Sequence, residues 1–176
     1  MGLRGGTLIT IKQANSWARQ HELADIEFAD SEVDTSGREK AVQPRPYADM
    51  TSARGAQYIG GAIFHASLDL THPLGYGYND ENLPVFRNSA LFMKKAENPY
   101  ATPLYYAEEP LASGYISEEN LEVLSGTAAI VVSDIGSGRV ISMTDNPNFR
   151  AFWYGTNKLF MNAVFFGLTI DGGSEN

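Results

Sequence analysis

Runs of β-branched and apolar residues along the chain predict the strands of a sheet. Residues 128–133 and 139–143 are two such runs, and they flank Gly136-Ser137-Gly138, a sequence typical of the turn of a β-hairpin. Residues 5–11 form another β-branched, apolar run after a double glycine, which predicts a buried parallel strand. Further strands are expected at residues 61–68, 84–86 and 90–93.

A strongly apolar helix is predicted after the hairpin. Asn146 can cap its free N–H groups, Pro147 suits its first position because proline has no N–H to lose, and Gly167 is a natural end. At 100° per residue, one face collects Phe149, Phe152, Trp153, Thr156, Leu159, Phe160, Ala163 and Val164, and the last turns add Met161, Phe165 and Phe166 outside that face. We therefore expect the end of this helix to be buried on more than one side, in the core and at an interface.

Shorter helices and loops are expected elsewhere. Asn15 or Ser16 can cap a short helix that carries Trp17, and Ser117 resembles the start of another. The remaining segments are a mobile loop or insertion at residues 30–46, a short helix at 47–57, a turn at 71–78 and an irregular, aromatic stretch at 99–110.

Composition fits a single globular domain over residues 1–176, with 43% hydrophobic and 11% aromatic residues. The formal net charge of −8 and the lack of a basic cluster disfavour a nucleic-acid partner. Apolar runs are too short for a membrane span, and no signal-peptide pattern is present. Because the chain has no cysteine, disulfides, thiolate metal sites and a cysteine nucleophile are excluded.

Common hydrolase motifs are missing from the sequence. None of the three histidines is followed by glutamate three residues later, and His21-Glu22 has no second histidine at the spacing of a zinc peptidase. No Gly-x-Ser-x-Gly pentad occurs. Gly136-x-Gly138 lacks the third glycine of a dinucleotide-binding loop, and a hairpin turn explains it. We therefore predict no catalytic residue and no metal ligand in this chain.

Three residues are the candidates for a ligand pocket. Asp69 precedes His72 by three positions, and a carboxylate that holds an imidazole is half of a nucleophilic triad. Arg150 lies at the predicted start of the last helix, where free N–H groups favour an anion. A structural role in a turn or on a solvated helix edge explains each of them as well. The alternatives are a hydrolase that uses His72 and Asp69 with Ser67 or Ser113, and a small-molecule binding module around Tyr76, Tyr105 and Tyr106.

With these segments in view, the chain resembles a domain found after the catalytic domain in some large bacterial zinc carboxypeptidase-family proteins. The matching segments are residues 5–9, 61–64, 68–77, 111–116 and 136–163. The most specific of them is 145–162, which begins Asp145-Asn146-Pro147-Asn148-Phe149. The resemblance therefore covers most of the chain.

The resemblance implies a three-layer αβα architecture with a mostly parallel sheet, like a class I glutamine amidotransferase or flavodoxin, here truncated at its N-terminus. It implies a non-catalytic accessory domain that packs against or positions the peptidase domain of the same or a companion polypeptide, in the periplasm or outside the cell. A homodimer is the alternative assembly. Amide transfer does not carry over, because the amidotransferase nucleophile is a cysteine and this chain has none. No cofactor is expected in this chain, since the zinc ligands belong to the separate peptidase domain.

Overall fold

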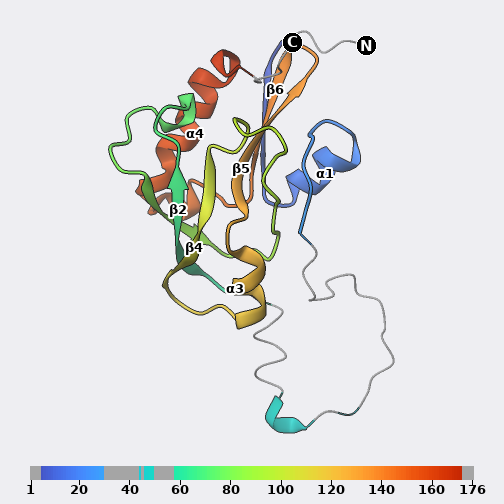
Figure 1. Ribbon diagram of the computed structural model, residues 1–176, viewed down its shortest axis with the longest axis vertical. Coiled ribbons are helices and arrows are strands. Elements are labelled where there is room, and N and C mark those ends of the chain that lie inside the picture. Colours follow the sequence, from blue (N-terminus) through green and yellow to red (C-terminus); the bar gives the residue numbers. More distant parts are fainter. Residues whose placement is uncertain (1–4, 30–43, 45, 50–57, 172–176) are drawn as a thin grey trace.

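The computed structural model describes residues 5–29, 44, 46–49 and 58–171. Within them, six strands form one sheet in the order β1-β6-β5-β4-β2-β3 (Figure 1). The strands are β1 (Thr7–Ile11), β2 (Ala62–Leu68), β3 (Asn82–Arg87), β4 (Leu104–Ser113), β5 (Ala128–Ile135) and β6 (Gly138–Met143). The α-helices are α1 (Ala14–Gln20), α3 (Glu118–Leu124) and α4 (Asn157–Phe166). The 3₁₀ turns are η1 (Tyr47–Asp49), η2 (Pro73–Gly75), η3 (Phe149–Ala151), η4 (Tyr154–Thr156) and η5 (Gly167–Thr169).

The expected three-layer αβα fold with a mostly parallel sheet is wrong. Only β1 and β6 pair in parallel among the described strands, and every other neighbouring pair is antiparallel. The sheet curls into a half-barrel. Parallel neighbours need long crossover connections, usually helices. Here β5 and β6 are joined by the short turn that the sequence predicts, and β2 reaches β3 through the turn that carries η2. The chain is therefore a mixed sheet with few helices, and the amidotransferase-like fold does not apply.

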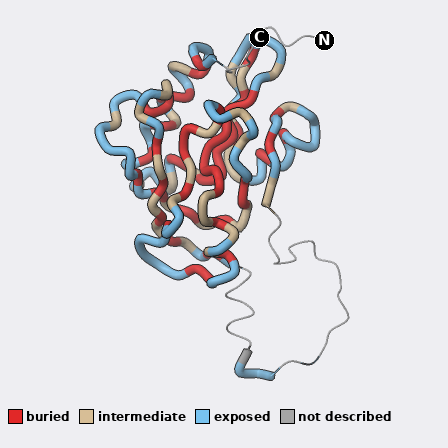
Figure 2. Tube along the Cα trace, viewed as in Figure 1, coloured by how far each residue is buried: buried red, intermediate tan, exposed pale blue. Residues whose placement is uncertain are grey.

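Helices cover the two faces of the sheet unequally. On one face, Leu159 and Ala163 of α4 pack in the larger core cluster with Ile141 of β6. On the other face, Ala18 of α1 packs in a smaller cluster with Val131 of β5. β5 and β6 are thus buried on both sides over most of their length, as the red tube of Figure 2 shows. The apolar composition of β5 and β6 follows from this double burial.

Several predicted elements are confirmed. The strand at 5–11 is β1 and is parallel to β6, the strand at 61–68 is β2, and the hairpin is β5–β6. The burial expected for the strand at 5–11 is wrong, because β1 lies at the edge of the sheet and only its Thr10 is buried. Ser117 caps α3, because its side chain accepts a hydrogen bond from the N–H of Asn120 at 3.3 Å. The short strand at 84–86 lies within β3, whereas the one at 90–93 is reduced to bridges at Met93.

Residues 104–110 of the irregular stretch expected at 99–110 instead form the first part of β4, whereas residues 99–103 lie outside any strand. Tyr106 pairs with Ala66 of β2 and Leu111 with Phe64, so the four residues between them on β4 face a single residue on β2. The extra residues form a bulge that contains Pro110. Proline lacks the N–H that a regular ladder requires, and a bulge tolerates it. The composition of this segment suggested a loop, but its proline marks a bulge within a strand.

The last helix begins ten residues later than predicted. Arg150 and Ala151 have φ values of 50° and 54°, in the left-handed region, so the chain turns there instead of continuing a helix. The side chain of Phe149 stacks on Phe86 of β3, with ring centroids 4.1 Å apart. The Oγ1 of Thr156 donates a hydrogen bond to the carbonyl of Pro147 at 2.7 Å. Contacts with the edge of the sheet thus replace the first half of the predicted helix.

Two other local predictions are also corrected. Asn15 does not cap α1: it is fully buried, accepts a hydrogen bond from Thr10 and donates one to the carbonyl of Met143. Gly167 is not a left-handed helix end, since its φ is −54°. A Cβ on Gly167 would lie 2.5 Å from the Thr7 side chain, so close packing of η5 on β1 explains the glycine.

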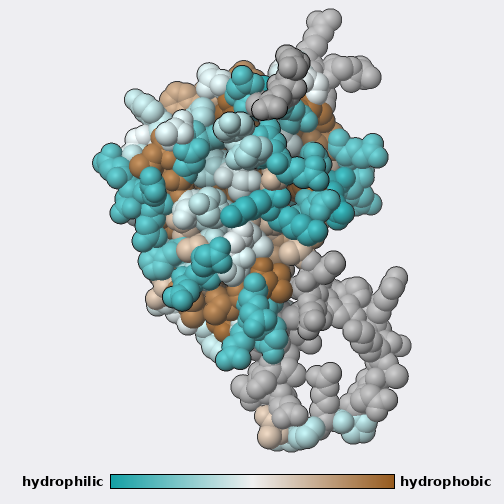
Figure 3. Space-filling model, viewed as in Figure 1, coloured by the Kyte–Doolittle hydropathy of each residue, from teal (hydrophilic) through white to brown (hydrophobic). Residues whose placement is uncertain are grey.

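The predicted loop at 30–46 and most of the helix predicted at 47–57 lie outside the described residues; within 47–57, the structure shows η1. Among the described helices, none is long and apolar enough to cross a membrane. Hydrophilic side chains cover most of the face shown in Figure 3, and apolar surface appears there in separate patches.

Candidate functional site

Asp69 and His72 lie in the turn that follows β2, and each is engaged in shaping that turn. The Asp69 carboxylate accepts hydrogen bonds from the N–H of Thr71 at 2.8 Å and from its hydroxyl at 2.6 Å. The Nδ1 atom of His72 accepts a hydrogen bond from the N–H of Leu74 at 3.1 Å, which caps η2. The turn prediction for 71–78 is thus confirmed, and both side chains have local backbone partners.

This geometry argues against the hydrolase that uses His72 and Asp69. Because Nδ1 is an acceptor, the proton of the neutral ring lies on Nε2, the atom that would have to accept a proton from a serine. Nε2 is buried without a hydrogen-bond partner among the described atoms. Ser113 pairs with Ile63 at the opposite end of β2 from His72, about 16 Å along the strand from Leu68. Asp69 and His72 are therefore turn-forming residues.

The His72 turn predicts a stability that depends on pH. Burial lowers the pKa of His72, and the charge of Asp69 opposes this only in part. The unfolded chain therefore binds a proton more readily, so stability should be greatest above pH 6.5 and fall as pH decreases through the lower, folded-state pKa. Urea denaturation at pH 7.5 and pH 5 should show this loss. Asparagine can also cap η2 but does not titrate, so His72→Asn should reduce the loss, whereas a change at the exposed His21 should leave it intact.

Arg150 does not join the other two candidates. It lies in η3, is exposed, and its guanidinium lies 5.3 Å from the ring centroid of Phe149. Because no helix begins at this point, the free N–H groups expected to bind an anion beside Arg150 are not arranged as a helix start. The described residues show no contact between Arg150 and either Asp69 or His72. The three candidates therefore do not form one pocket.

The three tyrosines of the binding-module alternative are also apart. Tyr105 and Tyr106 are neighbours on β4, so their side chains leave opposite faces of the sheet. Tyr105 is covered by the ammonium of Lys95, 3.8 Å from its ring centroid, whereas Tyr106 is buried. Tyr76 packs edge-on against Phe166 near α4. The aromatic loop proposed from the sequence is not a single surface.

Sequence reasoning missed a buried polar cluster around Arg87. Arg87, the last residue of β3, is fully buried. Its Nη1 donates hydrogen bonds to Tyr106, Thr144 and Asp145, each at 3.2 Å. The hydroxyl of Tyr106 also donates to Asp145. The guanidinium lies over the rings of Tyr106 and Phe92. This cluster joins the edge strand β3 to the segment that leaves β6.

The charges in this cluster stabilise one another. Burial disfavours the charged form of Arg87, but Asp145 and Tyr106 outweigh it and raise the pKa of the guanidinium. Burial, together with the negative charge of Asp145, raises the pKa of Tyr106 well above its usual value, so its phenol stays protonated. Leu83 and Val85 precede Arg87 at alternate positions of β3. This alternation places Arg87 on the same inward face as the two apolar residues. A charged residue at such a position needs a buried partner, and this was the sequence signal that could have indicated the cluster.

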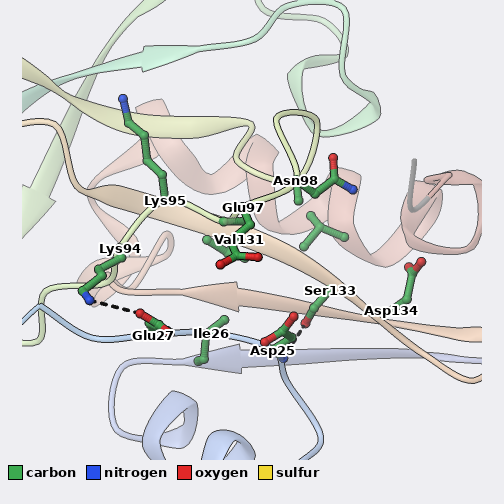
Figure 4. A pocket seen from close by; sticks show the side chains of 13 residues that line it. Asp25, Ile26, Glu27, Lys94, Lys95, Glu97, Asn98, Val131, Ser133 and Asp134 are labelled. Atoms are coloured by element: carbon green, nitrogen blue, oxygen red, sulfur yellow. Dashed lines mark hydrogen bonds and ion pairs between the residues drawn. The ribbon is translucent and has the colours of Figure 1, made fainter. Parts of the chain in front are cut away.

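A polar groove opens beside β5, on the side of the sheet that carries α1 (Figure 4). It has a volume of about 410 Å³, a size that suits a small molecule. The lining residues are Asp25, Ile26, Glu27, Lys94, Lys95, Ala96, Glu97, Asn98, Ala101, Val131, Val132, Ser133 and Asp134. Lys94 and Glu27 form an ion pair of 3.0 Å across one end.

The groove combines charged side chains of both signs with one serine. Its serine, Ser133, accepts a hydrogen bond from the N–H of Asp25 at 3.3 Å. No histidine is among the described residues that line it, so the groove offers no imidazole base to this hydroxyl. A search of the described residues finds no group of three carboxylate, histidine or cysteine side chains placed to hold a metal ion.

The outward side of α4 is apolar and exposed. The inward side of this helix holds Leu159 and Ala163 in the core. On the outward side, Val164 is 53% exposed, Phe165 70% and, in η5, Leu168 66%. We define the α4 face as the exposed Met161, Val164, Phe165 and Leu168 of α4 and η5, together with two neighbouring exposed tyrosines, Tyr76, which packs against Phe166, and Tyr154 in η4. Asn157 and Lys158 are polar and exposed in the first turn, so the exposed apolar surface begins at Met161 and continues into η5. A patch of this kind has the composition of an interaction surface.

Comparison of the chain with known protein families, with curated proteins and with solved structures found no match.

Proposed function

We propose that this chain is a non-catalytic accessory domain that packs against another protein surface through the α4 face. The proposal depends on one observation, which is that α4 presents apolar side chains both toward the core and away from it. One side fills the core through Leu159, and the other exposes Val164, Phe165 and Leu168. Exposed apolar patches of this kind mark interaction surfaces in soluble proteins. The way His72 is held in its turn supports the non-catalytic part of the proposal.

In this proposal the domain positions a zinc carboxypeptidase-like peptidase domain, in the periplasm or outside the cell. That part is supported by the sequence segments 68–77 and 145–162, which resemble the accessory domains of such proteins. The amidotransferase-like fold that the same resemblance implies is excluded by the sheet topology, so this part of the proposal rests on those sequence segments alone. Any zinc would be held by the peptidase domain, so the present chain contributes surface and not metal ligands.

The purified chain supplied with zinc should not release amino acids from peptides with free C-termini. His72 is engaged in a backbone hydrogen bond, and the described residues place no set of ligands around a common point. Release of C-terminal amino acids can be followed by mass spectrometry, with an active zinc carboxypeptidase as the positive control. Turnover that a chelator abolishes would contradict the non-catalytic part of the proposal.

A further inference from the structure

We infer that the α4 face joins two copies of this chain in a symmetric dimer. The inference rests on the proposed function, in which this face is an interface, and it names the partner as a second copy. In a twofold dimer the same patch serves both subunits, so a single apolar helix face is sufficient. An accessory domain of this kind would position its peptidase domains by pairing the polypeptides that carry them.

The size of the face fits such a dimer. Its six side chains are between 43% and 75% exposed. A large aromatic side chain presents roughly 150–250 Å² in full and the smaller side chains present less, so covering all six at these exposures would bury at most about 700 Å² on each copy. A stable protein interface buries about 800 Å² on each partner. The face therefore approaches the area of such an interface when all six side chains are covered, and we expect a dimer of modest affinity.

The charges on the helix also suit self-association. Residues 157–166 contain no aspartate or glutamate, and their single charged residue is Lys158. Its ammonium donates a hydrogen bond to the carbonyl of Gly77 at 2.5 Å and lies 4.8 Å from the ring centroid of Tyr78. Two copies of this face therefore meet with little like-charge repulsion and little need to remove water from unpaired charges.

The geometry follows the rules of helix packing. Met161, Phe165 and Leu168 are spaced by four and three positions, so they form one ridge along the outward side of the helix. This ridge can cross its symmetry mate with Phe165 near the twofold axis. Elsewhere each chain carries a net charge of −8 over its whole sequence, which repels a second copy at long range. Added salt screens this repulsion and should strengthen the dimer.

Sedimentation equilibrium on the whole chain between about 1 and 100 μM tests the inference, because that range brackets the affinity of a modest interface. We expect the mass to approach that of a dimer with concentration and with added salt. Phe165→Lys should weaken association at least about tenfold, as for a central aromatic anchor. Tyr115→Lys is the matched control, since Tyr115 is 62% exposed outside the α4 face, and it should leave association unchanged.

Cysteine crosslinking gives a second, independent measurement, because the natural chain contains no cysteine. Val164→Cys should form a disulfide-linked dimer readily under mild oxidation, and Tyr115→Cys should not. Circular dichroism would establish that each variant is folded. Equal crosslinking at both positions would overturn the inference, as would a wild-type chain that stays monomeric at the highest concentration.

The failure of this inference can be separated from failure of the proposed function. A monomeric chain that binds a zinc carboxypeptidase-like peptidase domain, and loses that binding with Phe165→Lys, overturns the dimer but keeps α4 as an interface. A monomeric chain that does not bind such a domain overturns both.

Discussion

Replacing Arg87 by methionine should lower the free energy of unfolding by about 3–5 kcal/mol, because one member of a buried ion pair is removed and the other remains. Arg87 is fully buried, and Asp145 is 6% exposed. In the variant, the Asp145 carboxylate would keep the Tyr106 hydroxyl but lose its cation. Urea denaturation at pH 7.5 would measure the change, and the melting temperature should drop by roughly 10 °C.

An exposed ion pair provides the control for Arg87. Lys94 pairs with Glu27 at 3.0 Å, and the two side chains are 54% and 68% exposed. Lys94→Met should change stability by less than about 1 kcal/mol, since exposed pairs contribute little. Replacing Arg87 and Asp145 together by apolar residues should recover part of the loss, because no unpaired charge would remain. Equal effects of the Arg87 and Lys94 variants would contradict the structural role given to the buried cluster.

Leu159→Ala should destabilise the chain by about 2–5 kcal/mol, the usual cost of a cavity in a close-packed core. Leu159 is 2% exposed and anchors α4 in the larger core cluster. It also lines a small pocket beside Asp145 and Thr156, which truncation would enlarge. Thermal and urea unfolding would measure the effect.

The same substitution on the other side of the segment is the control. Leu168 is 66% exposed, so Leu168→Ala should cost less than about 0.5 kcal/mol when measured at concentrations where the chain is monomeric. At higher concentrations it should weaken the dimer inferred above. Similar losses from both leucines in the monomer would mean that α4 buries both of its apolar sides within one chain.

Elements with local signals were predicted well. Ser117 caps α3, and the turn Gly136-Ser137 connects two apolar runs as a hairpin, because both depend on residues close in sequence. Prediction was wrong where a distant partner decides the conformation. Phe149 stacks on Phe86, and the chain turns at Arg150 instead of starting a helix. Pro110 was taken as part of a loop, although pairing with β2 accommodates it in a bulge.

The candidate site shows the same division. Asp69 and His72 were correctly assigned to a turn, because Pro73 restricts the backbone of its immediate neighbours and so indicates the turn from adjacent residues alone. The groove beside β5 draws residues from three separate segments, at 25–27, 94–101 and 131–134, so no single pattern in the sequence indicated it. Arg87 and Asp145 are likewise 58 residues apart along the chain.

The sequence by itself determined where most strands lie, which end of the chain carries the apolar helix, and that no thiol chemistry occurs. Spacing and composition act over a few residues, so they determine such features directly. Only the tertiary structure decided that the sheet is mixed, which side of α4 enters the core, and that Arg87 meets Asp145. Those outcomes depend on pairing between distant strands. A strand that is buried on both faces is apolar throughout whatever the direction of its neighbours, and β5 is such a strand with two antiparallel neighbours.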